Sequence, residues 1–188
     1  MSDLVQVVYV SRATFKPMPT AAGGVEPHVA RILQQSRTNN PRLGIGGVLY
    51  YGEGSFFQCL EGERPVVEAL IEKLRMDDRH KDFRIIHQVD IKERQFTDWS
   101  MKYIPTSDVV KGLLKQAGYQ RFDPYQFDEA MVRKLLKTFR DLNAEGAGTG
   151  SGSTRAKPAA PASASPLPFV LAGVVIVILL VVVGVFVL

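Results

Sequence analysis

The order of strand and helix patterns between residues 4 and 104 strongly limits the folds available to this chain. The stretch LVQVVYV (4–10) is apolar on both faces, which is typical of a strand covered on both sides. Other segments carry apolar residues three or four positions apart, as helices do. The predicted strands are 4–10, 44–51, 55–62, 83–91 and 99–104, and the predicted helices are 28–40 and a segment that begins at Pro65.

These elements follow one another as β-α-β-β-α-β-β. Because crossovers between parallel strands are right-handed, both helices are expected on the same face of one sheet. The predicted fold is therefore an α+β ferredoxin-like sandwich with one added strand. In this topology the first and third strands are central neighbours.

The second face of this sheet needs a cover, and residues 106–143 are predicted to supply it as C-terminal capping helices. Asp123 stands where an N-cap is expected before Pro124, and Gln126 has the position of its capping-box partner. An amphipathic helix with a single apolar stripe is expected to lie on the bare face of the sheet. The stripe consists of Phe127, Met131, Leu135, Phe139 and Leu142.

The composition changes after residue 143. Residues 144–166 are rich in Gly, Ala, Ser and Pro and are predicted to form a flexible linker. Residues 167–188 carry no charge, and the twenty residues from 169 to 188 would extend about 30 Å as a helix, which matches the hydrocarbon core of a bilayer. We expect a single transmembrane helix here, a tail anchor. Arg155 and Lys157 precede it and would keep the folded domain, residues 1–105, in the cytoplasm.

Charge and cysteine content argue against some classes of protein. The formal net charge of +4 is too small to indicate a nucleic-acid partner by itself. Cys59 is the only cysteine, so no internal disulfide can form, which agrees with a reducing compartment.

Two polar residues stand inside apolar strands. Tyr9 has the same orientation in its strand as Val5 and Val7, and Gln58 lies in the middle of SFFQCLEG. A buried amide without hydrogen-bond partners costs about 1–3 kcal/mol, so Gln58 is expected to meet a partner. Because the two strands are predicted neighbours, that partner can be Tyr9.

The two predicted helices carry polar residues along their apolar stripes, Ser36 and Asn40 in the first and Asp77 in the second. Polar groups that converge between two helices over a sheet indicate a pocket for a planar, hydrogen-bonding ligand. A structural hydrogen-bond network is the alternative interpretation.

Several motifs occur in a characteristic order and spacing. They are VYVSRA, ILQQSRTNNPRLGIGGVLYY, SFFQCLEG, the DDRH after the second helix, and RQFTDWSMKYI. Together these motifs, across residues 3–105, resemble the BLUF family, whose members sense blue light with FAD.

The resemblance implies that FAD binds non-covalently between the two helices. The flavin ring would lie against Ile32 and Leu74, and Asn40 would hold its polar edge. No enzymatic residue and no metal ligand is implied. The residues implied to bind FAD are Tyr9, Ile32, Ser36, Asn39, Asn40, Gln58, Leu74, Asp77, Arg79 and His80.

The resemblance also implies a photochemical switch without turnover. Light would drive an electron and a proton from Tyr9, and their return would leave the Gln58 amide rearranged by rotation or tautomerisation. A new hydrogen bond from Gln58 to the flavin would shift the absorption to the red. Trp99 and Met101, on one face of the last strand, are the family's candidates for carrying the change through the sheet, and either of them can lie beside Gln58.

Three other functions stay open: a small enzyme such as a hydrolase, an RNA-binding sheet, and a tail-anchored scaffold with a structural pocket. His28, His80 and His87 lie in unrelated segments without metal-ligand spacing, which does not favour the enzyme. The aromatic and glycine signature of RNA-binding sheets is not evident, so no nucleic acid is expected. The expected output is a signal to a separate, unidentified protein, or a change of homo-oligomer, at the membrane.

Overall fold

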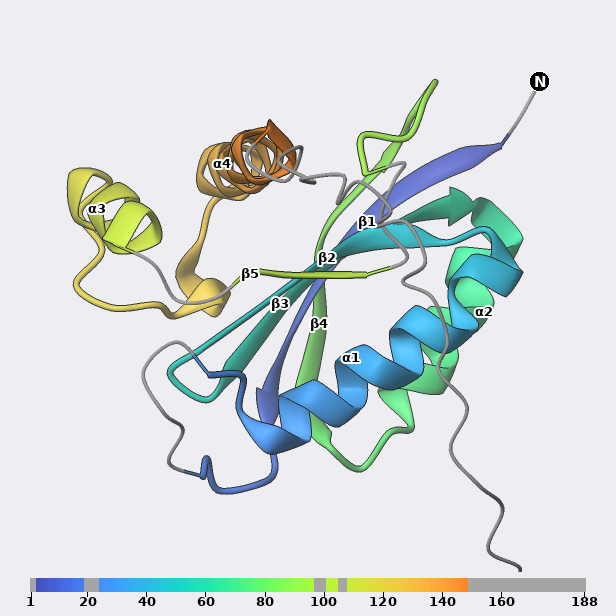
Figure 1. Ribbon diagram of the computed structural model, residues 1–188, viewed down its shortest axis with the longest axis horizontal. Helices are drawn as coiled ribbons and strands as arrows, with labels where there is room; N and C mark the ends of the chain where they lie inside the picture. Colours follow the sequence, from blue (N-terminus) through green and yellow to red (C-terminus); the bar gives the residue numbers. More distant parts are fainter. Residues whose placement is uncertain (1–2, 19–23, 97–100, 105–107, 149–188) are drawn as a thin grey trace, which may run out of the picture. The chain divides into compact units, whose positions relative to one another are not determined.

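A five-stranded sheet forms the centre of the fold (Figure 1). The computed structural model describes residues 3–18, 24–96, 101–104 and 108–148. The strand order is β4-β1-β3-β2-β5, and all neighbours are antiparallel except β2 and β5, which are parallel. The strands are β1 (Leu4–Ala13), β2 (Gly46–Gly52), β3 (Ser55–Glu63), β4 (His80–Asp90) and β5 (Lys102–Ile104).

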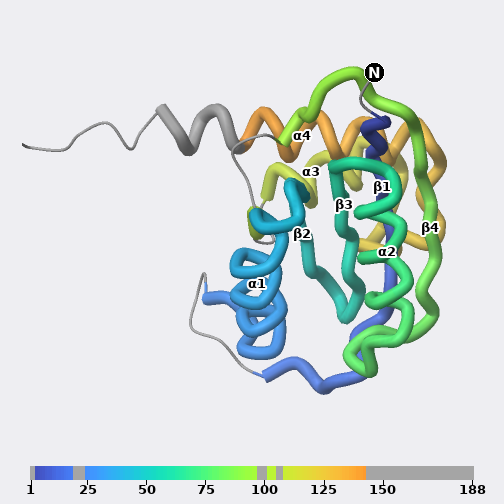
Figure 2. The backbone as a smooth tube through the Cα atoms, turned by 90° about the vertical axis from the view of Figure 1, so that its right-hand side faces the viewer, coloured from blue at the N-terminus to red at the C-terminus, as the bar shows by residue number. Residues whose placement is uncertain are grey.

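Helices cover both faces of the sheet, α1 and α2 on one and α3 and α4 on the other (Figures 1 and 2). This arrangement confirms the mixed fold, with the first two helices on one face and the last two as the cover of the other. The helices are α1 (Pro27–Asn39), α2 (Arg64–Arg75), α3 (Asp108–Gln116) and α4 (Glu129–Gly148).

The alternation of side chains along β1 explains why the sheet has two separate apolar cores. Val7 and Tyr9 pack with residues of α1 and α2, whereas Val8 and Val10 pack with residues of α3 and α4. Successive side chains of a strand point to opposite faces, so an unbroken apolar run supplies both cores at once. Tyr9 therefore belongs to the core beneath α1 and α2.

Local signals at both ends place helix α1. The Glu26 side chain accepts a hydrogen bond from the Val29 backbone nitrogen at 2.9 Å, and Pro27 occupies the first turn. At the other end the Asn40 backbone nitrogen donates to the Ser36 carbonyl at 2.8 Å. Asn40 is thus held at the end of the helix, where it is buried.

Helix α4 begins later than predicted. Pro124–Gln126 form only a short 3₁₀ helix, and Phe127 is extended. Asp123 does not cap a backbone nitrogen, because its side chain accepts from the Gln126 amide at 2.9 Å instead. The cap of α4 is Asp128, whose carboxylate accepts from the Met131 backbone nitrogen at 2.7 Å.

Three predicted segments differ from the structure or lie outside it. Helix α4 continues to Gly148 and includes the start of the predicted linker, because AEGAG contains good helix formers and its glycines stand near the end. The last strand starts at Lys102, so Met101 precedes it, and Trp99 lies outside the described residues. The predicted span 167–188 also lies outside them, and no helix among the described residues is long and apolar enough to cross a membrane.

Candidate functional site

Tyr9 and Gln58 meet at the centre of the sheet, beneath α1 and α2. They are direct partners in the antiparallel register of β1 and β3, and both are buried. The Tyr9 hydroxyl donates a hydrogen bond to Gln58 Oε1. The ring of Tyr9 stacks on Phe83 of β4, with centroids 4.4 Å apart. The structure therefore supplies the partner that the buried amide needs.

The environment of Tyr9 keeps its phenol protonated. Burial raises the pKa of Tyr9 far above its usual value; the negative charge of Asp77 adds to the rise, and Arg79 opposes it. The hydroxyl is consequently a hydrogen-bond donor at every physiological pH, and Gln58 Oε1 is its acceptor.

The other end of the Gln58 amide contacts Met101. Gln58 Nε2 donates to Met101 Sδ at 3.3 Å, and Met101 is 2% exposed. Of the two predicted candidates, Met101 is therefore the one that lies beside Gln58 in the described part of the chain. A thioether is a weak acceptor and cannot donate a hydrogen bond.

A cavity of about 370 Å³ lies between α1 and α2, a volume within the range of small-molecule sites. Eight of the ten predicted FAD-binding residues line it, whereas Tyr9 and Gln58 do not. The eight are Ile32, Ser36, Asn39, Asn40, Leu74, Asp77, Arg79 and His80.

Five further residues line the cavity and were not predicted as site residues: Gln35, Arg42, Leu43, Leu70 and Lys73. Helical spacing could have identified three of them, because each lies four residues before a predicted site residue. Gln35 precedes Asn39, Leu70 precedes Leu74, and Lys73 precedes Asp77 by this distance. Arg42 and Leu43 belong to a 3₁₀ turn, whose residues do not follow the helical period.

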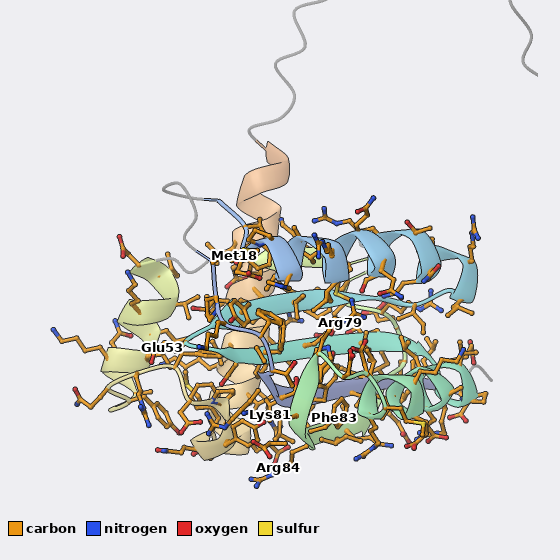
Figure 3. All side chains as sticks on the ribbon, turned by 90° about the horizontal axis from the view of Figure 1, so that it is seen from below. Met18, Glu53, Arg79, Lys81, Phe83 and Arg84 are labelled. Atoms are coloured by element: carbon orange, nitrogen blue, oxygen red, sulfur yellow. The ribbon has the colours of Figure 1, made fainter. Side chains whose placement is uncertain are left out.

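A charged group joins the two sides of the cavity. Arg79 Nε donates to Asp77 Oδ1 at 2.8 Å, and Arg79 Nη2 donates to Gln35 Oε1 at 2.9 Å. Arg79 belongs to the segment that follows α2, and its side chain thus reaches Gln35 of α1 (Figure 3). The hydrogen bonds from Arg79 hold the pKa of Asp77 below its usual value, so its carboxylate stays ionised at neutral pH.

His80 adds an uncharged polar group to the cavity wall. Its Nδ1 lies 2.8 Å from Ser11 Oγ, and its Nε2 is buried without a hydrogen-bond partner among the described residues. Burial lowers the pKa of His80 to about 4, although Asp77 opposes this effect, so the ring is neutral at pH 7. A buried polar atom without a partner is a position at which a ligand can supply one.

The residues of the cavity fit a flavin. Ile32, Leu70 and Leu74 offer apolar surface to a flat ring, and the Asn39 and Asn40 amides offer both donors and acceptors. His80 Nε2 offers a further polar contact. This combination of apolar walls with a few polar groups is typical of cofactor sites.

The comparison with known families agrees with this chemistry. The sequence profile of BLUF, described as sensors of blue-light using FAD, matches residues 4–102. That is more than half of the chain. The chain belongs to the BLUF family. FAD is the chromophore of BLUF domains, and this domain is a sensor, as expected, and not an enzyme.

The chain is similar to proteins and solved structures that contain this domain. The chain is 31% identical over 124 residues to photoactivated adenylate cyclase subunit beta of Euglena longa, a match that covers 61% of this chain but only 14% of the relative. Among solved structures, the BlsA ground state has a TM-score of 0.66 and 32% identity and covers 73% of this chain and 87% of that one. The dark state of BlrB, a BLUF protein, has a TM-score of 0.59 and 26% identity, with 75% and 98% covered.

Proposed function

We propose that this chain is a blue-light receptor in which FAD lies in the cavity between α1 and α2 and the Tyr9–Gln58 pair is the switch. The observation that supports this most directly is the buried hydrogen bond from the Tyr9 hydroxyl to Gln58 Oε1, on the same side of the sheet as the cavity. Two polar side chains inside an apolar core need a function or a full set of partners.

In this proposal each part of the cavity holds one part of the cofactor. Ile32 and Leu74 lie against the ring, and Asn39 and Asn40 bind its polar edge, with Ser36 beside them. Asp77, Arg79 and His80 contact the outer part. When bound, the flavin supplies the absorption of blue light and an electron acceptor.

Tyr9 and Gln58 have complementary roles. Tyr9 yields an electron and, along its hydrogen bond to Gln58, a proton, and it recovers both, so no bond is made or broken overall. The Gln58 amide is left rearranged, by rotation or tautomerisation. The amide can record the event because it has a donor end and an acceptor end.

Met101 favours the dark arrangement of the amide. In that arrangement Gln58 Oε1 accepts from Tyr9 and Nε2 donates to Met101 Sδ, so both ends are satisfied. After a rotation that exchanges the ends, Oε1 would face a sulfur that cannot donate. The contact between Gln58 and Met101 is therefore less favourable in the rearranged amide than in the dark one. This difference in free energy favours the return of the amide in the dark.

The test uses the full chain, purified in detergent. We expect a yellow protein with a flavin spectrum whose absorption shifts to the red under blue light and returns in the dark. A colourless protein that cannot be reconstituted with FAD, or a flavoprotein without the shift, would contradict the proposal.

We further propose that residues 1–105 form the sensor and that residues 106–143 cover its sheet. Residues 144–166 would link them to residues 167–188, which would anchor the chain to a membrane from the cytoplasmic side. The uncharged apolar composition of the last segment and the preceding Arg155 and Lys157 support this location. The signal would pass to a separate protein or through a change of oligomer.

Membrane fractions should contain the full chain and not a chain cut after residue 148. Equal partition of the two chains between membrane and soluble fractions would contradict the anchor.

A further inference from the structure

Met101 is held from two sides. Its Sδ accepts from Gln58 Nε2 at 3.3 Å, and its backbone carbonyl accepts from Arg37 Nε at 3.0 Å. The first bond comes from β3 and the second from α1. The residue that contacts the amide is thus tied to the helix that forms one wall of the cavity.

The side chain of Met101 is packed in the core beneath α1 and α2, but the described ladder of the sheet does not include its backbone. Strand β5 has three residues, and its register with β2 begins at the pair Val48↔Lys102, so Met101 lies just outside the ladder. Its side chain has three rotatable bonds and adapts to many positions. The position of Met101 Sδ relative to Gln58 therefore depends on a contact that fixes the Met101 backbone.

Arg37 supplies that contact. It lies in the last turn of α1, and its planar guanidinium donates in a fixed direction. Arg37 is not among the residues that line the cavity, although its neighbour Ser36 is. Among the described residues Arg37 thus contacts Met101 and does not line the cavity.

We infer that Arg37 is a positioning residue: its bond to the Met101 carbonyl orients the sulfur toward Gln58 and so sets how fast the rearranged amide returns to its dark arrangement. This inference rests on the proposed function. A general stabilisation of the end of α1 by the positive charge of Arg37 is the competing explanation.

The experiment measures the rate of dark recovery of the full chain after blue light. Arg37→Gln should keep its flavin and its red shift but recover about threefold or more slowly, the change expected from the loss of one hydrogen bond. Arg31→Gln is the matched control, because Arg31 is exposed on the same helix and its replacement removes the same positive charge. It should recover at the rate of the unmodified chain.

A double-mutant cycle separates the two explanations. If Arg37 acts through Met101, Arg37→Gln should have no further effect on recovery in a Met101→Leu background, since leucine offers no acceptor. Equal effects of Arg37→Gln in both backgrounds, or an unchanged or faster recovery in Arg37→Gln alone, would overturn the inference.

If Arg37→Gln fails to hold flavin, Arg37→Lys, which keeps the charge at the helix end, replaces it in the same cycle, and the same criteria apply. If the unmodified chain itself shows no red shift, the proposed function fails first. A normal photocycle that is indifferent to Arg37 contradicts this inference alone.

Discussion

At the scale of single residues, the site depends on an amide whose two ends have different partners. Gln58 accepts from Tyr9 and donates to Met101, and it is 2% exposed. A buried residue with this pattern has little structural reason to be an amide when the surrounding core is apolar, because an aliphatic side chain would need no partners.

We predict that Gln58→Leu keeps flavin and loses the light-induced red shift. Leucine fills a similar volume but has neither donor nor acceptor, so nothing can be rearranged. Light-minus-dark absorption spectra measure the effect. Gln88→Leu, which replaces an exposed amide on β4, is the control and should shift normally. A normal shift in Gln58→Leu would contradict the mechanism.

We predict that Tyr9→Phe binds flavin but does not form the red-shifted state, because phenylalanine has no hydroxyl proton and is much harder to oxidise. The change also leaves Gln58 Oε1 buried without its donor, which should lower the free energy of unfolding by about 1–3 kcal/mol. Absorption spectra and urea unfolding measure the two effects. A red-shifted state in this variant would exclude Tyr9 as the required donor.

At the scale of elements, a buried carboxylate holds the described residues that follow β4. Glu61 of β3 is fully buried and accepts from the Gln6 amide at 2.5 Å and from the backbone nitrogens of Gln95 and Phe96 at 2.7 and 3.0 Å. The Gln95 side chain in turn accepts from Arg140 of α4 at 2.8 Å. Glu61 thus connects the central sheet to residues 95 and 96, and the Gln95 side chain connects them to α4.

We predict that Glu61→Gln lowers the free energy of unfolding by about 1–3 kcal/mol. An amide has one acceptor oxygen and two N–H donors, so it would present a donor where Glu61 now accepts from three N–H groups. Urea unfolding measures the change. Glu63→Gln at the partly exposed end of the same strand is the control and should change stability by less than about 0.5 kcal/mol. Equal stability of the two variants would show that the Glu61 bonds do not stabilise the fold.

At the scale of the whole molecule, the sheet separates two cores with different contents. The core beneath α3 and α4 is apolar and aromatic, and Phe139 of α4 stacks on Tyr50 with centroids 5.7 Å apart. The core beneath α1 and α2 contains the Tyr9–Gln58 pair and lies next to the cavity. The face that holds the Tyr9–Gln58 pair is therefore also the face that carries the cavity.

We predict that the protein loses stability as the pH falls from about 6.5 to about 4. In this window His80 is protonated in the unfolded chain but stays neutral in the fold, because burial lowers its pKa to about 4. The unfolded state then binds more protons, and the loss from His80 approaches about 3 kcal/mol at the lower end.

Urea unfolding at several pH values, compared between the unmodified chain and His80→Gln, measures this contribution. The comparison is needed because the pKa of His87 is also lowered by burial and acts in the same direction. The variant should lose less stability than the unmodified chain in this window. Parallel curves for the two proteins would show that His80 does not titrate as stated.

The sequence by itself determined the order of the first seven elements, the two covered faces of the sheet, and the placing of Tyr9 and Gln58 on neighbouring strands. These features follow from local periodicity and from the phase of residues in neighbouring strands. Helix ends were less predictable: Asp128 and not Asp123 caps α4, because either aspartate satisfies the local pattern and packing selects between them.

Only the tertiary structure decided which residues complete the site. The contact of Met101 with Gln58 and Arg37, and the bond from Arg79 to Gln35, join segments between 43 and 64 residues apart in the chain. No periodic pattern specifies such pairs. They depend on the register of β5 against β2 and on the spacing of α1 and α2, which are set when the whole sheet packs.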